Sequence, residues 1–209
     1  MILQALYDYY LRKMRDPDPA RRLPAAGLED KEIPFILELA ADGRLIGISD
    51  TRTQEGKKKI ARRFLVPQGV KKTSGVAANL LWDTAEYVLG FDTKGKPERV
   101  AEQTAAFRRR VEEVAQRAPD DAGLQAVLAF LSSEPLAAAQ GQSAWAEIAE
   151  ANPLLSFRLA SEDAVDLVCQ RPAVVAAIAS PSEPTAAAAQ GLPCLITGGN
   201  AEPERLHSA

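Results

Sequence analysis

Histidine and cysteine are nearly absent from this sequence, and their scarcity removes several classes of functional site. The chain has one histidine, His207, and two cysteines, Cys169 and Cys194, which lie far apart and form no CxxC pair. Because the single histidine stands close to the end of the sequence, no His-Cys, Ser-His or histidine-metal site is expected. Two separated cysteines support neither a disulfide framework nor a zinc site. Both cysteines are predicted to be small core residues.

Long apolar runs and convergent acidic residues are also missing. No run of about 18 apolar residues is present, and the first segment reaches Asp8 too early for a secretory signal. We therefore expect a cytoplasmic protein without a membrane partner. Asp120-Asp121 fits a helix start, and Asp83 with Glu86 fits one exposed helical face. Nothing marks the carboxylate cluster of a two-metal nuclease, so no metal or other cofactor is predicted.

The chain does contain one strongly cationic segment, "GKKKIARRFLVPQGVKKTSG", at residues 56–75. It carries seven Lys and Arg residues and no acidic residue, whereas the whole chain has a net charge of −3, so −3 less +7 leaves −10 elsewhere. This segregation argues against a protein that coats nucleic acid with its whole surface, but it permits one basic region directed at phosphates. A solvated loop without a binding role is the alternative interpretation of such a charge run.

A phosphate-binding P-loop does not explain this segment. Lys72-Thr73 matches part of the GK[ST] ending of that motif, but the two required glycines are replaced by Lys71 and Val66. Those glycines let backbone N–H groups surround the phosphates, so nucleotide hydrolysis is not expected without them. The segment suits nucleic-acid binding better than catalysis, and the protein is not predicted to be an enzyme.

The hydrophobic pattern predicts an α+β fold in which a small antiparallel sheet is covered by several helices. Asp42-Gly43 separates two β-prone runs and suits a tight hairpin turn. Strands are expected at 33–39, 44–48 and 63–66, and another in "PLLSFRLA". Helices are expected at 2–14, at 97–117, in "DDAGLQAVLAFLSS", in "SAWAEIAEA" and around Pro172. The helix at 97–117 begins with Pro97 and has an apolar face made of Val100, Thr104, Phe107, Val111 and Val114.

In this arrangement the basic segment contributes to two loops, 51–61 and 69–75, which flank the strand at 63–66. The cations would lie either at both ends of a sheet edge or in one patch of about 15–20 Å, at roughly 3.3 Å per strand residue. The following "SGVAANLLW" has a helix-like pattern with Ser74 as its cap, and "AEYVLG" fits either a strand or a helix.

The end of the chain differs from the rest. "PSEPTAAAAQGL" reads as a linker, "PCLITGG" as a strand, and "NAEPERLHSA" has no closing element. We therefore expect the chain to be a fragment of a longer polypeptide. Within the chain, 1–95 would be a mixed sheet and helix part with the basic loops, 96–180 mainly helical, and 181–209 a linker with a truncated strand.

Four segments resemble the large subunit of the type I-C CRISPR Cascade surveillance complex: "MILQALYDYY", "IPFILELAADGRLIGISD", "GKKKIARRFLVPQGVKKTSGVAANLLWDTAEYVLG" and "CLITGG" followed by "ERLH". The family's members are much longer, so the resemblance implies that residues 1–209 are the N-terminal domain of such a subunit. It also implies a non-catalytic DNA-binding subunit of a crRNA-guided antiviral complex. Such a subunit recognises a short T-rich protospacer-adjacent motif (PAM) and helps to open the duplex into an R-loop, while the guide RNA reads the remaining sequence. The implied partners are double-stranded target DNA, the crRNA-bearing Cascade subunits, and a helicase-nuclease recruited after target binding.

The resemblance also suggests two sets of DNA-binding residues. The predicted phosphate contacts are Lys57, Lys58, Lys59, Arg62 and Arg63. The predicted groove-facing set is Lys71, Lys72, Thr73, Ser74, Gly75 and Asn79, because A·T pairs offer only acceptors in the minor groove. Asn79 is alternatively a surface or capping amide. Trp82 and Tyr87 either stack on an unpaired base or belong to the core.

The competing hypothesis is a structural adaptor. In that case the basic loops would grip the guide RNA or neighbouring Cascade subunits, and another part of the subunit would read the DNA. Both hypotheses predict salt-sensitive binding of nucleic acid.

Overall fold

The computed structural model describes residues 2–18, 21–25, 27–72, 75–160, 166–179, 192–193 and 200–201. The chain divides into two compact units, one made of residues 1–26 with 180–209 and the other of residues 27–179. The first unit contains the helix α1 (Ile2–Met14), which confirms the predicted helix at 2–14. It also contains two short antiparallel strands, β9 (Leu192–Pro193) and β10 (Asn200–Ala201).

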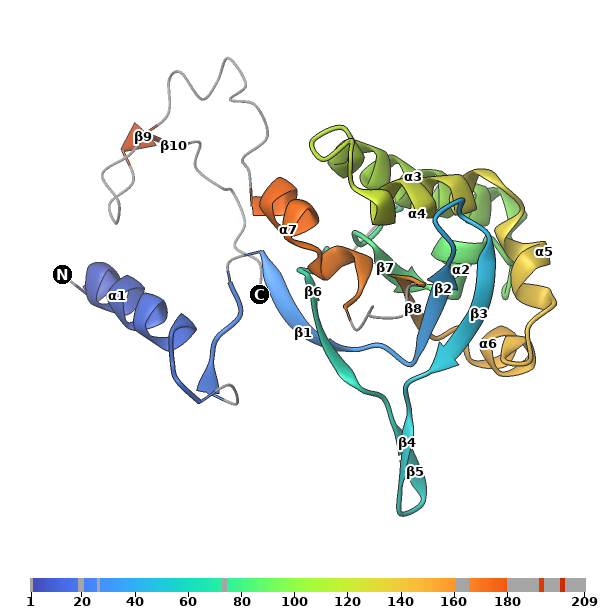
Figure 1. Ribbon diagram of the computed structural model, residues 1–209, viewed down its shortest axis with the longest axis horizontal. Helices are drawn as coiled ribbons and strands as arrows, with labels where there is room; N and C mark the ends of the chain where they lie inside the picture. Colours follow the sequence, from blue (N-terminus) through green and yellow to red (C-terminus); the bar gives the residue numbers. More distant parts are fainter. Residues whose placement is uncertain are drawn as a thin grey trace. The chain divides into compact units, whose positions relative to one another are not determined.

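The second unit carries the remaining elements, which Figure 1 labels. Its strands are β1 (Leu28–Glu32), β2 (Phe35–Leu39), β3 (Leu45–Asp50), β4 (Thr53–Glu55), β5 (Lys58–Ile60), β6 (Arg63–Pro67), β7 (Trp82–Thr84) and β8 (Leu154–Leu159). Its helices are α2 (Ala85–Leu89), α3 (Pro97–Ala115), α4 (Ala122–Ser132), α5 (Pro135–Gln140), α6 (Trp145–Ala151), the 3-10 turn η2 (Val168–Gln170) and α7 (Pro172–Ala179).

A four-stranded sheet in the order β3-β2-β8-β7 forms the centre of this unit. Strands β2 and β3 form the predicted antiparallel hairpin, and Gly43 in its turn has a φ of +86°. A Cβ atom at Gly43 would lie 2.5 Å from the Cβ of Ala129 in α4, so the turn needs glycine for space as well as for backbone freedom. The α+β fold class is confirmed, although β2 and β8 form a parallel pair that the sequence did not indicate.

The third predicted strand exists but joins a different partner. Strand β6 pairs antiparallel with β1 in a separate two-stranded sheet and does not extend the β2–β3 hairpin. Ile33 and Pro34 stand between β1 and β2, and a proline cannot donate to a strand ladder. The Ile33 N–H donates instead to the Arg62 carbonyl at 3.2 Å, so the β1–β6 ladder ends where the central sheet begins.

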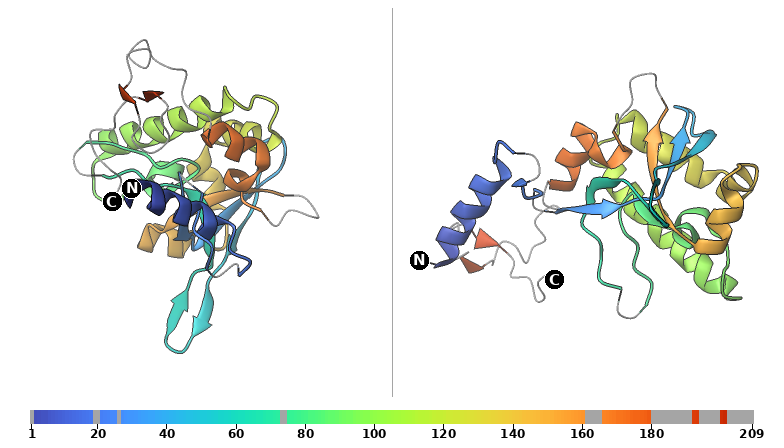
Figure 2. Two further views of the ribbon diagram at one scale, coloured as in Figure 1. Left: turned by 90° about the vertical axis from the view of Figure 1, so that its left-hand side faces the viewer. Right: turned by 90° about the horizontal axis from the view of Figure 1, so that it is seen from below.

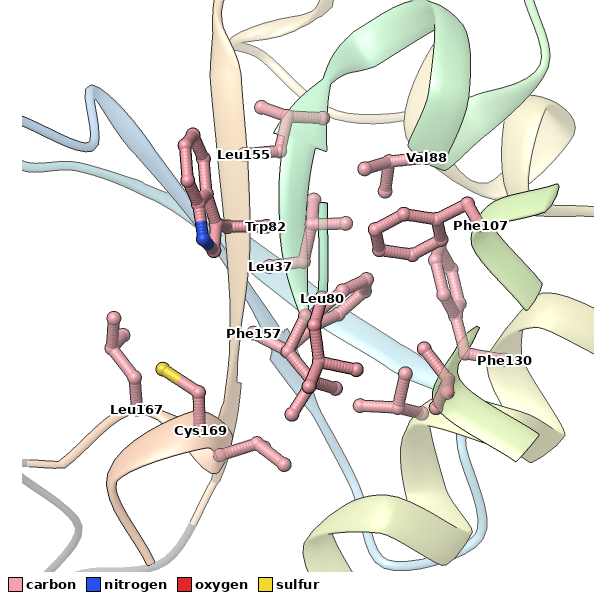
Figure 3. Packing of buried hydrophobic residues seen from close by; sticks show 14 of the residues in the cluster. Leu37, Leu80, Trp82, Val88, Phe107, Phe130, Leu155, Phe157, Leu167 and Cys169 are labelled. Carbon is pink, nitrogen blue, oxygen red and sulfur yellow. The ribbon is translucent and has the colours of Figure 1, made fainter. Parts of the chain in front are cut away.

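The core lies between the central sheet and helices α2 to α4. Leu155 and Phe157 of β8 point toward the helices, and the Phe157 ring centre lies 6.1 Å from that of Phe107 in α3 and 6.2 Å from that of Phe130 in α4 (Figure 3). Cys169 of η2 is buried, as predicted, whereas Cys194 lies outside the described residues. The strand therefore packs on the helices through alternate residues.

Most predicted helices form with close to the predicted bounds. Helix α3 starts at Pro97, and its predicted apolar face is buried except at Thr104, which is half-buried. Asp121 caps α4 by accepting from the Leu124 N–H at 3.0 Å, and α7 starts at Pro172. Residues 75–81 are not helical, so that part of the prediction is wrong, and α5 was not predicted. In the part of the chain that the structure describes, no helix has the length and apolar character needed to cross a membrane.

Candidate nucleic-acid interface

The first half of the basic segment forms a β-hairpin, not the irregular loop predicted for residues 51–61. Strands β4 and β5 pair antiparallel, and the turn between them contains Gly56, at a φ of +61°, and Lys57. All residues of both strands are exposed, and the hairpin projects from the rest of its unit (Figure 1). Lys57 and Lys58 are therefore held away from the core.

An ionic cluster fixes the base of this hairpin. The Arg52 guanidinium donates to both carboxylate oxygens of Glu147 and to both of Asp50, each at 2.7 Å, and it stacks over the Phe35 ring at 4.4 Å. The Lys59 ammonium donates to Glu147 at 3.2 Å. Hydrogen bonds from Arg52 lower the pKa of both Asp50 and Glu147 and raise the pKa of Arg52 itself. The two cations and two anions balance, which leaves the cluster without net charge.

The arginines that follow the hairpin differ in their contacts. Arg63 donates to Asp30 at 2.9 Å and to Glu32 at 3.3 Å across the β1–β6 pair, and the hydrogen bond to Asp30 raises the pKa of Arg63. Arg62 is exposed, and its guanidinium lies 5.0 Å from the centre of the Phe64 ring. Arg63 thus has two carboxylates beside it, whereas Arg62 remains directed at solvent.

The second half of the basic segment lies in a long connection between β6 and β7, which we call loop 68–81. Its described residues, 68–72 and 75–81, have no helix or strand, as predicted for 69–75. Lys71 is exposed, and Gly75 has a φ of +83° with open space around the position of a Cβ atom. Thr73 and Ser74, two of the predicted groove-facing residues, lie outside the described residues.

Lys72 contacts a buried carboxylate. Its ammonium donates to the two Asp83 oxygens at 2.6 and 2.8 Å and lies 3.8 Å from the centre of the Tyr87 ring. The Asp83 side chain is fully buried. The prediction that Asp83 and Glu86 form an exposed helical face is wrong. Asp83 belongs to the edge strand β7 and is buried, and Glu86 is buried in α2, where it accepts from the Thr93 hydroxyl.

Asn79 is buried, although it was predicted to face a DNA groove. Its side-chain oxygen accepts from the Val70 N–H at 2.9 Å and so ties the two limbs of loop 68–81 together. Trp82 and Tyr87 are also buried, as the core interpretation expects, and the Trp82 indole N–H donates to the Pro67 carbonyl at 2.8 Å. In this structure these residues support the loop, and none of the three is presented to a ligand.

The cations fall into two separate sites. The hairpin lies before β6 and loop 68–81 after it, and their described residues project in different directions (Figure 2). Within the described residues, the ion pairs involve Lys59, Arg63 and Lys72 but not Lys57, Lys58, Arg62 or Lys71. Within the same residues, no group of three or more His, Cys, Asp or Glu side chains is placed to hold a metal ion. The positive charge free for a ligand is thus at the hairpin, at Arg62 and at Lys71.

Comparison with known proteins gives one family. A family model described as "CRISPR-associated protein (Cas_Csd1)" matches residues 6–209. A search of curated proteins finds no match to the chain. The matched region includes the hairpin, loop 68–81 and every element of the second unit.

Proposed function

The chain belongs to the Cas_Csd1 family of CRISPR-associated proteins, and from this premise we propose that it is a DNA-binding subunit of a type I-C Cascade complex. In this proposal it recognises the PAM of double-stranded target DNA and aids duplex opening. It has no catalytic activity of its own, and its partners are the crRNA-bearing subunits and a helicase-nuclease that arrives after target binding.

The exposed cations of the hairpin are the observation that best supports DNA binding. Lys57 and Lys58 extend from the fold without an ion pair among the described residues, on a chain whose net charge is −3. Lysines held in this way neutralise phosphates of any sequence, which gives affinity and orientation but no sequence preference. We assign the hairpin and Arg62 to the DNA backbone.

Loop 68–81 is the better candidate for reading the PAM. It presents the exposed Lys71 and, four residues later in sequence, open space around the backbone of Gly75. The minor groove of A·T pairs offers only acceptors to donors such as Lys71. Thr73 and Ser74 lie between them in sequence and remain predicted members of this site. The buried position of Asn79, and the contact of Lys72 with the buried Asp83 carboxylate, favour a supporting role for both residues.

The test compares the two sites in the assembled complex. Binding is measured to duplexes that carry or lack the T-rich motif, for wild type, Lys71→Ala and a Lys57→Ala/Lys58→Ala variant. Loss of one good base contact costs about 1–3 kcal/mol of discrimination, so Lys71→Ala should lower the preference for motif-bearing DNA by about 5- to 150-fold. The hairpin variant should weaken both duplexes alike. If neither variant changes binding to DNA, the basic sites contact guide RNA or neighbouring subunits, and the adaptor hypothesis replaces this proposal.

A further inference from the structure

The backbone at the end of loop 68–81 has an unusual conformation. Leu81 has a φ of +62°, in the left-handed region that favours glycine, and its side chain is fully buried. Leucine rarely adopts this conformation, and such outliers concentrate at functional sites. The Ser156 hydroxyl donates to the Leu81 carbonyl at 2.9 Å, so the central sheet holds this turn in place.

Asp83 is the acceptor around which the turn and the loop are arranged. One of its oxygens accepts from the Thr84 N–H at 2.8 Å, and the other accepts from the Asn79 N–H at 2.8 Å. Each oxygen also accepts from the Lys72 ammonium. A carboxylate has about four lone-pair sites, and all of these are used here. A single buried side chain thus contacts both limbs of the loop.

The contacts continue from this carboxylate to the rest of the loop. The Asn79 N–H donates to Asp83, and the Asn79 side-chain oxygen accepts from the Val70 N–H. Asn79 therefore connects Asp83 to Val70. Next to Asn79 in sequence, the Ala78 carbonyl accepts from the Arg110 guanidinium of α3 at 3.2 Å. Val70, Lys72, Ala78 and Asn79 are therefore fixed to the folded unit, while Lys71, between Val70 and Lys72, is exposed.

We propose that Asp83 is a positioning residue, which through Lys72 and Asn79 holds the two described limbs of loop 68–81, residues 68–72 and 75–81, in the conformation that binds DNA. We call Asp83 with Lys72 and Asn79 the anchor of the loop. Lys72 is then its structural cation, and the neighbouring Lys71 contacts DNA. A buried carboxylate requires its partner cation, which gives Lys72 a role that Lys71 does not share. Limbs that are already held in place lose less conformational entropy on binding. This inference rests on the proposed role of the loop in PAM recognition.

The sign of one effect separates this proposal from its main competitor. If Lys72 itself bound DNA and Asp83 only competed for it, removing the Asp83 charge would release Lys72 and tighten binding. If Asp83 positions the loop, the same change weakens the preference for motif-bearing DNA.

The chain offers a matched control for this experiment. Asp121 is also a buried aspartate, with a side chain 3% exposed, and it pairs with Arg171, which is 35% exposed; Lys72 is 33% exposed. Asp83→Asn and Asp121→Asn therefore each remove one buried charge from a pair with a partly exposed cation. Only the first change affects loop 68–81. Hydrogen exchange is measured on the DNA-free protein, and binding to both duplexes is measured in the assembled complex.

Asp83→Asn should speed hydrogen exchange of the Val70 and Asn79 amides by at least about tenfold, because the charged hydrogen bonds of Asp83 hold the two limbs of the loop. Asp121→Asn should leave the exchange of both amides unchanged. The ratio of motif-bearing to motif-free affinity should fall about fivefold or more in Asp83→Asn alone. Lys72→Met should reproduce both effects and add little to Asp83→Asn. If Asp83→Asn does not fold, Asn79→Ala cuts the next link and should give the same pattern at Val70.

Three results have distinct meanings. Unchanged exchange at Val70 and Asn79, or tighter DNA binding by Asp83→Asn, would overturn the anchor. Faster exchange with a reduced affinity ratio supports it. A third result is faster exchange in Asp83→Asn with an unchanged affinity ratio in both Asp83→Asn and Lys71→Ala. It would show that Asp83 fixes the loop but does not position DNA contacts, and it would also refute the proposed role of the loop in PAM recognition.

Discussion

Neutralising the hairpin tip should reduce the salt dependence of DNA binding by a predictable amount. Each cation that neutralises a phosphate contributes about 0.9 to the slope of log affinity against log salt. If all seven cations of the basic segment bound phosphates, they would contribute a slope of about 6.3, whereas the four without an ion pair contribute about 3.6. The ion pairs of Lys59, Arg63 and Lys72 are the basis for the lower value.

The variant Lys57→Gln/Lys58→Gln removes two of these free cations and should lower the slope by about 1.8. Between 50 and 200 mM salt, the wild-type complex should then lose about 12-fold more affinity than the variant. The assay is a salt titration of complex binding to one motif-bearing and one motif-free duplex, and both should respond alike. Thermal unfolding of each variant checks that the fold is intact.

A second variant with the same change in net charge provides the control. Lys59→Gln/Arg63→Gln also removes two cations, but Lys59 belongs to a neutral cluster and Arg63 lies beside two carboxylates. Its slope should change by much less than 1.8. If this control flattened the slope as much as the tip variant, the salt dependence would report net charge alone, and the division of the cations into free and paired sets would be wrong.

Two further predictions concern the stability of the fold. Arg52 lowers the pKa of Asp50 and Glu147, so the stability from these pairs is complete above their unfolded pKa values of about 4 and is lost as pH falls through the lower folded values. The melting temperature of Arg52→Met should therefore fall less steeply below about pH 4 than that of wild type, and parallel curves would contradict this reasoning. Gly43→Ala should lower the free energy of unfolding by about 2 kcal/mol or more, because its Cβ would overlap α4, whereas Gly95→Ala, at a φ of +68° in open space, should cost about 1 kcal/mol. Urea unfolding measures both, and equal losses would contradict the steric argument.

Helices and strands could be predicted from the sequence where the residues that determine them lie within the element itself. Helix α3 has an apolar face and a starting proline within its own residues, and the β2–β3 hairpin has Asp42-Gly43 at its turn. Strand β1 was missed because four of its five residues, "LEDKE", are charged and give no strand pattern. Its stability comes from pairing with β6, which stands more than 30 residues later.

In the candidate site, too, local features could be predicted and contacts between distant residues could not. Charge alone located the basic segment, since seven cations without an acidic residue stand out in any sequence. Which of them are paired depends on Asp30 and Glu147, which are remote from the segment along the chain. The burial of Asp83 could not be predicted either, because its neighbours in sequence suggest a surface helix. Its partner cation, Lys72, comes from loop 68–81, 11 residues earlier.

The parallel pairing of β2 with β8 determines the order in which this protein can fold during synthesis. It joins residues 120 positions apart, such as Glu38 and Arg158, so the central sheet cannot close until the ribosome has passed residue 159. At about 5–20 residues per second, the interval between synthesis of β2 and synthesis of β8 lasts roughly 6–24 seconds. The cationic hairpin is made early in that interval and Glu147 near its end, so the nascent chain carries Lys59 and Arg52 without their carboxylate partner on α6. Polyanions near the ribosome therefore meet a more basic chain than the folded protein presents.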